Sequence, residues 1–374
     1  MSICLNMIVK NEEKNLPRLF SSLQKYVDYY VISDTGSTDN TIAIIKELGE
    51  KYHIDGVITQ DEWVNFAHNR NIALQNAFKA YSEKKHECKW LLIIDADEEL
   101  IVQEPDFIAD LNPDKSYSIY KKDKGAYFRH LGLVCINQKK WQWNGVTHNY
   151  LISKSENYSN GFLSKCYIKC NNFEGAKSRN FKNQIEKSLK DIEYLEDELN
   201  DSVPNIKNIH RYFILANECF EAKLFDKAIA NYEIIVSNSH DIDIKYIALI
   251  QLGVITFEAL KQTEKAIEIF EKAIELDKNR KEAFYYMGMI YRHNFNMEKA
   301  LEILEKADEL SFVNPNYYVF DYSIYSWKIK FELLTIYHYL RNTEKTKLLI
   351  GQLINNEDVP KFQMTFISML KQKF

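Results

Sequence analysis

The chain has 374 residues, of which 46% are hydrophobic and 27% are charged, and its formal net charge at pH 7 is −5. This length allows two domains with separate cores, and the composition is that of a folded protein, which excludes wholesale disorder. Acidic and basic residues are mixed along the chain, whereas a nucleic-acid-binding protein needs a concentrated basic surface. We therefore expect no nucleic-acid partner.

The cysteines and the apolar runs indicate the compartment. The six cysteines include no Cys-x-x-Cys pair, so we expect free thiols in a reducing environment. The apolar run at the N-terminus is short and is interrupted by Asn6, which favours a strand over a signal peptide. No run approaches the ~20 apolar residues that a membrane helix requires. We expect a cytoplasmic protein without a transmembrane segment.

The first part of the chain alternates β-type runs with helical patterns. In chain order, we expect a strand at 2–9, a helix at 15–26, a strand at 28–33, a helix at 37–52, a strand at 55–59, a helix at 65–81 and a strand at 89–95. This alternation predicts βαβ units and a mostly parallel sheet that is covered on both faces. Ligands bind such sheets beyond the carboxyl ends of the strands.

The segment KWLLIIDADEEL joins the last of these strands to four acidic residues. Asp95 and Asp97 are separated by the small Ala96, and in an extended segment residues two apart point the same way, so both carboxylates can face one ligand. Such oxygen ligands suit Mg²⁺ or Mn²⁺ whose coordination is completed by substrate phosphates. The alternative is a helix N-terminus, where acidic residues complement the dipole, and for Glu98 and Glu99 we expect such a helix start.

Three further segments carry polar residues that could contact a nucleotide. Asp34 ends the second predicted strand ahead of Gly36 and suits a ribose or base, although an ordinary turn is the alternative. Arg70 lies at or near a helix start, where a guanidinium could bind a diphosphate or simply face solvent. His148 follows the turn at Gly145 and could be a third metal ligand, although a lone histidine in an aromatic setting is more often packed or hydrogen-bonded.

From Ser178 onward helical patterns dominate, and three segments align on one template. A small residue recurs at Ala216, Gly253 and Gly288, and each segment carries a Lys-Ala pair. The spacing fits the ~34-residue tetratricopeptide pattern, in which small residues lie where the two helices of a hairpin approach closely. A degenerate fourth unit has Leu333, Leu334, Tyr337 and Thr346 in the corresponding places. The aromatic segment 314–327 breaks the period, and we expect an interface or a lid there.

The motifs MIVKNEE, SDTGSTDNT, WVNFAHNRN, LLIIDADEEL and WQWNGVTHNYL, in this order, resemble the family 2 glycosyltransferases, in the branch that joins a short GT-A-type domain to tetratricopeptide repeats. The chain is also similar to bacterial peptide S-glycosyltransferases. The resemblance covers nearly the whole chain. It implies an α/β, Rossmann-like GT-A domain with a mostly parallel sheet at 1–177, a linker helix at 178–206 and an all-α tetratricopeptide domain at 207–374.

The resemblance also implies an activity and its site residues. It implies transfer of a hexose from a nucleotide-sugar, such as a UDP-sugar, to a glycan, peptide or protein by metal-dependent, inverting displacement. Asp95, Ala96 and Asp97 would bind Mn²⁺ or Mg²⁺ with the ribose and diphosphate, and His148 would complete the metal or diphosphate site. The other nucleotide-binding positions that it implies are Val9, Glu12, Asp34 and Arg70.

The catalytic base is the point at which the chain departs from the family. This branch often has Glu after the histidine, and Asn149 stands there instead. An inverting transferase needs a base for the acceptor's proton, although a thiol acceptor needs it less. Asp97 is expected to act through the metal, and the open candidates for the base are Glu98, Glu99 and Asp123.

The repeats and the tryptophans leave alternatives open. Tetratricopeptide arrays bind peptides or proteins, so the repeats could recognise the acceptor, form a homodimer or only support the catalytic domain. Trp63, Trp141 and Trp143 could stack on a sugar or base, although core packing is the alternative. The other functions that we consider are an inactive transferase-like scaffold that binds a protein partner, and a nucleotidyltransferase or sugar-nucleotide hydrolase.

Overall fold

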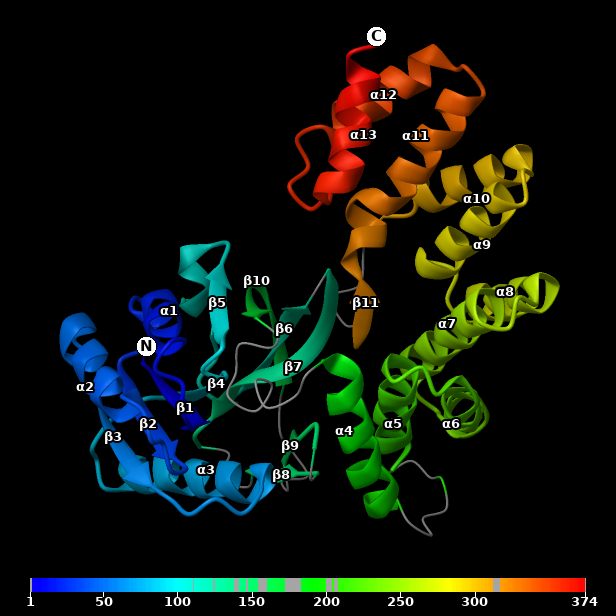
Figure 1. Ribbon diagram of the computed structural model, residues 1–374. Coiled ribbons are helices and arrows are strands. Elements are labelled where there is room, and N and C mark those ends of the chain that lie inside the picture. The colour runs from blue at the N-terminus through cyan, green and yellow to red at the C-terminus, as the bar shows by residue number, and fades with distance from the viewer. Residues whose placement is uncertain are drawn as a thin grey trace. The chain divides into compact units, whose positions relative to one another are not determined.

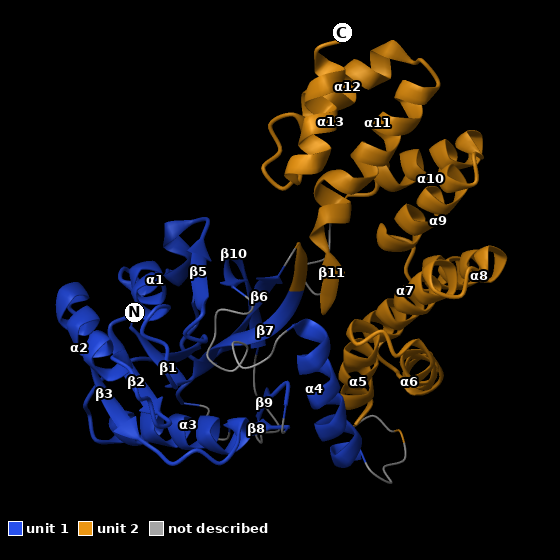
Figure 2. Cartoon of the chain, viewed as in Figure 1, with its two compact units in different colours: residues 1–123, 128–201 blue, residues 124–127, 202–374 orange. Residues whose placement is uncertain are grey.

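The structure is a computed structural model that describes residues 2–109, 111–123, 125–137, 141–145, 147–153, 160–171, 183–199, 204, 208–311 and 317–373. The chain divides into two compact units, which comprise residues 1–123 and 128–201 (unit 1) and residues 124–127 and 202–374 (unit 2), as Figure 2 shows. Among the described residues, no helix is long and apolar enough to cross a membrane.

The N-terminal part alternates strands and helices before a run of strands (Figure 1). Its elements are β1 (Ile3–Val9), α1 (Leu16–Leu23), β2 (Tyr29–Asp34), α2 (Thr41–Tyr52), β3 (Asp55–Gln60), α3 (Phe66–Ser82), β4 (Trp90–Ile93), β5 (Glu98–Val102), a 3₁₀ helix (Pro105–Ile108), β6 (Ser116–Asp123), β7 (Ala126–Cys135), β8 (Trp141–Asn144), β9 (Tyr150–Ser153), β10 (Asn160–Cys170) and α4 (Gln184–Leu199). The helix α4 lies within the segment 178–206, for which a linker helix was expected, and it belongs to unit 1.

The described strands of unit 1 form one mixed sheet in the order β3-β2-β1-β4-β7-β6-β10-β5, and β8 and β9 form a separate pair. The strands β3, β2, β1 and β4 are parallel, which confirms the βαβ arrangement. β7 runs antiparallel to β4, and β5 runs antiparallel to β10. The register pairs Val9 with Asp34, so the carboxyl ends of β1 and β2 meet at one edge.

Both faces of the sheet are buried because successive residues of β1 point into two different cores. Ile3, Leu5 and Met7 pack with the apolar faces of α1 and α2, whereas Cys4 packs with Leu91 of β4 and with α3. Strands that are buried on both faces read as continuous apolar runs, which is why β1, β2 and β4 were recognisable in the sequence. Helices therefore cover both faces, as expected.

The expected helix start at Glu98 and Glu99 is wrong. Both residues belong to β5, which pairs with β10 so that Glu98 lies opposite Cys170 and Glu99 opposite Lys169. Burial of Leu100 on the core side of this pairing favours the strand over the helix that the acidic residues suggested. The segment from Asp95 to Asp97 is not extended either, because it is a turn between β4 and β5.

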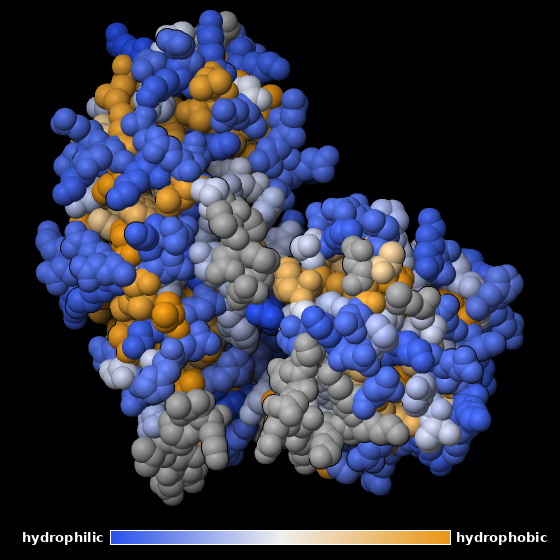
Figure 3. All heavy atoms as spheres, turned by 180° about the vertical axis from the view of Figure 1, so that it is seen from behind, coloured by the Kyte–Doolittle hydropathy of each residue, from blue (hydrophilic) through white to orange (hydrophobic). Residues whose placement is uncertain are grey.

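Unit 2 is built from helical hairpins, which confirms the predicted repeats (Figure 1). Its elements are α5 (Ile209–Glu221), α6 (Phe225–Asn238), α7 (Ile242–Glu258), α8 (Thr263–Leu276), α9 (Glu282–His293), α10 (Met297–Glu309), β11 (Val319–Asp321), a π-helix (Ile324–Lys328), α11 (Ile329–Tyr339), α12 (Thr343–Leu353) and α13 (Lys361–Lys371). The small residues lie at the close approach of two helices, because a Cβ atom on Gly253 would lie 2.5 Å from the ring of Phe270. The polar and apolar groups on the surface in Figure 3 are interspersed.

The turns of the hairpins repeat one backbone conformation. Each has a non-glycine residue with a positive φ two or three residues after the last residue of its first helix: Lys223 (60°), Lys261 (58°), Phe295 (58°) and Arg341 (57°). The next residue along, Asn296 in one turn and Asn342 in another, caps the second helix by accepting a hydrogen bond from a backbone N–H. The α11–α12 hairpin thus shares its turn conformation with the three hairpins before it, and its place as a fourth, degenerate repeat stays a prediction.

The segment that breaks the period is packed within unit 2. Residues 317–321 (the strap) lie against the start of α7 and against Arg280, which precedes α9. Residues 312–316 are outside the described residues. The guanidinium of Arg280 lies between the rings of Tyr246 and Tyr317, at 4.3 and 4.4 Å, and donates a hydrogen bond of 2.7 Å to the carbonyl of Val319. Arg280 also pairs with Asp243 and with Glu282.

Candidate active site

Most of the predicted site residues lie at or near the carboxyl edge of the parallel strands. β1 and β2 end at Val9 and Asp34, and Asp95 follows β4. β6 ends at Asp123, and the end of β10 pairs with the start of β5 at Glu98. Ligands of open α/β sheets bind beyond such an edge.

Asp95 to Glu98 form a hydrogen-bonded turn, which we call the acidic turn. The backbone N–H of Glu98 donates to the carbonyl of Asp95 at 3.1 Å, and the N–H of Asp95 donates to the Glu98 carboxylate at 2.9 Å. Arg18 and Asn171 donate to the carbonyl of Asp97 at 3.2 and 3.0 Å. The conformation of the turn is therefore set by side chains that are distant in sequence.

Arg70 neutralises Asp95. Its Nη2 atom lies 2.6 Å from Oδ1 of Asp95, and its guanidinium stacks 4.8 Å from the ring of Trp143. Burial alone would raise the pKa of Asp95, but Arg70 and Lys121 outweigh it and hold this pKa at about 2. Asp95 is therefore ionised at neutral pH. Arg70 lies inside α3 rather than at its first residue.

Asp97 lies in the opposite electrostatic situation. Burial and the neighbouring carboxylates of Asp95, Glu98 and Glu12 raise its pKa to about 7. Glu12 is itself buried and accepts a hydrogen bond of 2.7 Å from Asn15. A divalent cation would relieve this repulsion between carboxylates, so the donor set of the acidic turn fits Mn²⁺ or Mg²⁺.

Two of the candidate bases are engaged in ion pairs. The Glu98 carboxylate lies 2.7 and 2.9 Å from Nζ of Lys121. The Glu99 carboxylate lies 3.4 Å from Arg18, and it accepts hydrogen bonds from Lys169 and Asn171 at 3.5 and 3.1 Å. The third candidate, Asp123, ends β6 two residues after Lys121, and side chains two apart in a strand share a face.

Asp34 organises its own turn. Asp34 is 1% exposed, and its carboxylate accepts hydrogen bonds from the backbone N–H groups of Gly36 at 3.2 Å and of Ser37 at 3.1 Å. Gly36 has a φ of +95°, which a side chain would disfavour. The ordinary turn considered for this segment is therefore present, and contact of Asp34 with a nucleoside stays a prediction, as it does for Val9 and Glu12.

His148 lies beside Asp191 of α4, with 3.7 Å between Nε2 and Oδ2. Thr147 donates a 2.7 Å hydrogen bond to the other oxygen of Asp191, so α4 helps to hold this loop. In the described part of the chain, no group of three potential metal ligands with closely spaced ligand atoms contains Asp95 or Asp97. His148 as a third metal ligand stays a prediction.

The sequence did not reveal Lys121 or His130 as site residues. Lys121 is buried, and Glu98 and Asp95 raise its pKa to about 12 despite the desolvation. Burial and the charge of Lys121 hold the pKa of His130 well below its ordinary value, so a neutral imidazole lies near Asp95. The alternation of residues in SYSIYKKD indicates a strand, and a lysine near the end of a strand at the binding edge was the signal available.

The three tryptophans differ in burial. Trp141 and Trp143 are buried in the core under α3, whereas Trp63 is 39% exposed and packs edge to face on Phe66, with 4.8 Å between ring centroids. Core packing is therefore the role of Trp141 and Trp143, and Trp143 also supports Arg70. Trp63 keeps a surface that a ligand can reach.

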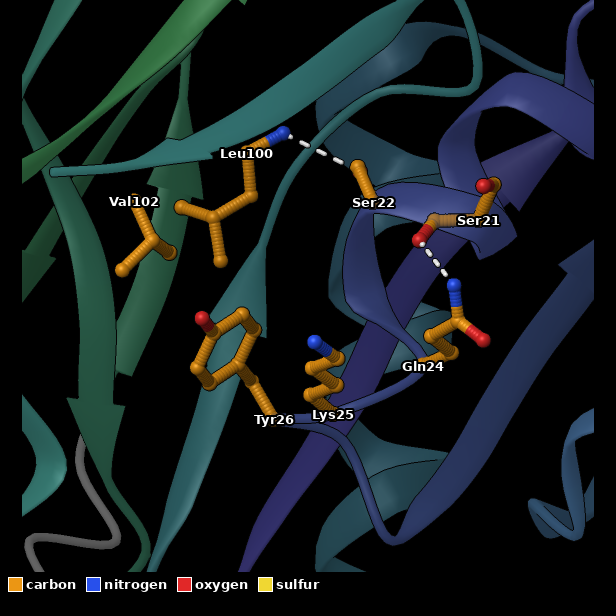
Figure 4. Close-up of a pocket in the computed structure, with 7 residues that line it drawn as sticks. All are labelled: Ser21, Ser22, Gln24, Lys25, Tyr26, Leu100 and Val102. Carbon is orange, nitrogen blue, oxygen red and sulfur yellow. Dashed lines mark hydrogen bonds between the residues drawn. The ribbon is translucent and has the colours of Figure 1, made fainter. Parts of the chain in front are cut away.

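A separate cavity of about 260 Å³ lies between α1 and β5, as Figure 4 shows. Its lining includes Ser22, Lys25, Tyr26 and Leu100, and the N–H of Leu100 donates to Ser22 at 3.2 Å. None of the predicted site residues lines it, so it is not part of the acidic turn's site.

Comparison with known proteins agrees with this division. Residues 4–104 match the model of glycosyl transferase family 2, and residues 248–280 and 282–314 match the tetratricopeptide repeat. A TPR repeat-containing protein of Synechococcus elongatus is 36% identical over 104 residues, which are 28% of this chain and 22% of that protein. A protein named as an uncharacterized glycosyltransferase of Rickettsia typhi is 31% identical over 180 residues, which are 43% of this chain and 56% of that protein.

The chain thus spans between about a fifth and a little more than half of the length of these relatives. Among solved structures, the TPR protein YrrB is 16% identical with a TM-score of 0.34, and the match covers 53% of this chain and 90% of that one. Pseudomonas aeruginosa pilF is 13% identical with a TM-score of 0.39, over 50% of this chain and 77% of that one. The family matches show that the chain carries a family 2 glycosyltransferase domain followed by tetratricopeptide repeats.

Proposed function

We propose that the chain transfers a sugar from a nucleotide-sugar donor, a UDP-sugar, to a glycan, peptide or protein by metal-dependent, inverting displacement. The observation that carries this proposal is the acidic turn at the carboxyl edge of the sheet, within the family 2 domain. There Asp95 is held ionised while Asp97 is destabilised as an anion, with pKa values of about 2 and about 7. Such an arrangement favours binding of a divalent cation.

The residues have separate roles in the proposed reaction. Asp95 and Asp97 would hold Mn²⁺ or Mg²⁺, which would stabilise the negative charge that develops on the departing diphosphate. Arg70 supplies positive charge beside Asp95 and aids the same leaving group. Val9 and Asp34 lie at the strand ends where the nucleoside would bind, and Glu12 follows β1 in the loop before α1. His148 would bind the metal or the diphosphate.

We propose Asp123 as the base that accepts the acceptor's proton. Glu98 and Glu99 are engaged in ion pairs, whereas Asp123 stands at the end of β6, two residues beyond the buried Lys121. Replacing Asp123→Asn should lower the turnover rate ~100-fold or more for a hydroxyl acceptor and leave nucleotide binding unchanged. For a thiol acceptor the loss should be smaller, because a thiol ionises more readily than a hydroxyl.

Calorimetric titration of the full chain with UDP and Mn²⁺ tests the donor site. We expect nucleotide binding that requires the metal and that Asp97→Ala abolishes while circular dichroism shows an unchanged fold. A screen of UDP- and GDP-sugars by mass spectrometry, with Mn²⁺ supplied, then identifies the donor. Metal-dependent binding without turnover of any donor would favour the inactive scaffold, and no binding at all would refute the donor site.

The repeats of unit 2 are proposed to bind the acceptor protein or a second copy of the chain, since tetratricopeptide arrays bind peptides and proteins. Size-exclusion chromatography with light scattering at several protein concentrations separates the two roles. A concentration-dependent dimer supports the homodimer, and a monomer throughout excludes it.

A further inference from the structure

A buried ion pair underlies the acidic turn. The side chains of Lys121 and Glu98 are only 11% and 8% exposed, and Nζ lies 2.7 and 2.9 Å from the two carboxylate oxygens. Burying two charges costs free energy that their attraction often does not recover, and apolar residues of similar volume are commonly as stable. Stabilisation of the fold alone therefore does not account for the presence of this buried ion pair.

The Glu98 carboxylate has no role left as a proton acceptor. One oxygen binds Lys121 and accepts a weak hydrogen bond of 3.4 Å from the thiol of Cys170. The other oxygen binds Lys121 and the backbone N–H of Asp95. Since Glu98 also donates its own N–H to the carbonyl of Asp95, it holds that residue from both sides. The backbone conformation of Asp95, from which its carboxylate projects, thus depends on Glu98.

Lys121 holds Glu98 in this position. It comes from β6, whereas Glu98 is the first residue of β5, and these strands are separated in the sheet by β10. Its charge also offsets the negative charges of Glu98 and Asp95, which lie within one turn. Without Lys121, Glu98 would be a buried and uncompensated charge, and the turn would open to solvate it.

We propose that Glu98 and Lys121 are positioning residues for the cation site: together they hold the acidic turn in its bent conformation, so that Asp95 and Asp97 need not reorganise when a divalent cation binds. This inference rests on the proposed function, because it assumes that these aspartates bind the cation. Groups that orient metal ligands in this way typically change metal affinity ~10- to 100-fold when they are removed.

The decisive variant is the double replacement Glu98→Gln with Lys121→Met, which removes one charge of each sign and leaves the net charge unchanged. If the pair acted only through its charge, the affinity for Mn²⁺ would stay near that of the wild type. If the pair positions the turn, the affinity should fall ~10-fold or more. The single variant Lys121→Met tests the direction of the change in Mn²⁺ affinity. Loss of a nearby positive charge alone should tighten cation binding, whereas loss of positioning should weaken it.

The affinity of the full chain for Mn²⁺ in the presence of UDP is measured by electron paramagnetic resonance of the free ion, at pH 8 and pH 9. Weakening at both pH values supports positioning, and weakening that disappears at pH 9 overturns it, since proton competition would then explain the effect. Lys169→Met is the matched control, because Lys169 bonds the neighbouring Glu99 at 3.5 Å and is half-exposed. We expect its affinity to stay within about twofold of the wild type.

The two proposals fail in different ways. No Mn²⁺ binding by the wild type would refute the proposed function. Binding by the wild type that the folded double variant retains unchanged would refute the positioning role alone. If Lys121→Met does not fold, the double variant still tests the inference, because it leaves no uncompensated buried charge.

Discussion

A methyl group added at Gly253 should destabilise unit 2, whereas the same change at Gly351 should stabilise it. Both glycines lie inside helices, α7 and α12, where alanine is favoured over glycine by ~1 kcal/mol. The new Cβ atom at Gly253 would lie 2.5 Å from Phe270, and at Gly351 it would meet no atom within 4 Å. The two changes are therefore chemically identical and differ only in the space available.

Phe270 cannot easily withdraw from the added methyl group. Its ring is 1% exposed and is stacked on Tyr286 with 5.5 Å between centroids, so it is held from the other side. Overpacking of a core costs ~1–3 kcal/mol, which exceeds the helical gain. We expect Gly253→Ala to lower the free energy of unfolding by ~1–2 kcal/mol and Gly351→Ala to raise it by ~0.5–1 kcal/mol.

Urea unfolding of the full chain, followed by far-ultraviolet circular dichroism, measures both changes. A double-mutant cycle with Phe270→Leu shows the cause, because the smaller side chain should recover much of the loss at Gly253 and nothing at Gly351. A stabilising Gly253→Ala, or a loss that Phe270→Leu leaves unchanged, would refute the assignment of this position to the close approach of two helices.

Three further predictions concern charge and backbone strain. The pKa of Asp97 is raised from 3.8 to about 7, so the folded chain favours its protonated form, and acidification from pH 8 to pH 5 should stabilise the ligand-free chain. Asp97→Asn should have a higher melting temperature than the wild type at pH 8 and a flatter pH dependence. A lower melting temperature of Asp97→Asn at pH 8 would contradict this. Phe295 is 79% exposed and has a positive φ, which asparagine adopts more readily, so Phe295→Asn should raise the free energy of unfolding in urea by ~1 kcal/mol. A lower free energy of unfolding would show that the ring is needed. Arg280→Met should lower the free energy of unfolding by ~3–5 kcal/mol in the same assay, because Glu282 and Asp243 lose their partner. A change of less than ~1 kcal/mol would show that the strap is independent of this residue.

The features that the sequence predicted well are those set by residues close together in the chain. The strands β1, β2 and β4 appear as apolar runs because both of their faces are buried, and the repeats appear through the small residues that hairpins require, such as Gly253 and Gly288. Asp34 and Asp95 were placed at the binding edge because strand ends are visible in the alternation of elements.

What the sequence did not predict depends on partners far along the chain. Glu98 begins a strand because β10, about 70 residues later, pairs with it, and no local pattern contains that pairing. Nor does a local pattern show that Lys121 reaches Glu98, or that Asn171 holds the carbonyl of Asp97. Acidic residues after a strand resemble a helix start, but at Glu98 and Glu99 the tertiary pairing with β10 determines the conformation.

The strap changes how the helical array can come apart. In most repeat arrays each repeat contacts only its neighbours, so an end can fray while the rest stays folded. Here Asp243 at the start of α7 accepts a hydrogen bond from the backbone of Tyr318, 75 residues later, and Arg280 holds Val319. The helices between these points are therefore enclosed in one loop of chain. During synthesis α7 to α10 are made before residues 317–321, so the contacts that the strap adds to this part of the array form only after the strap has left the ribosome.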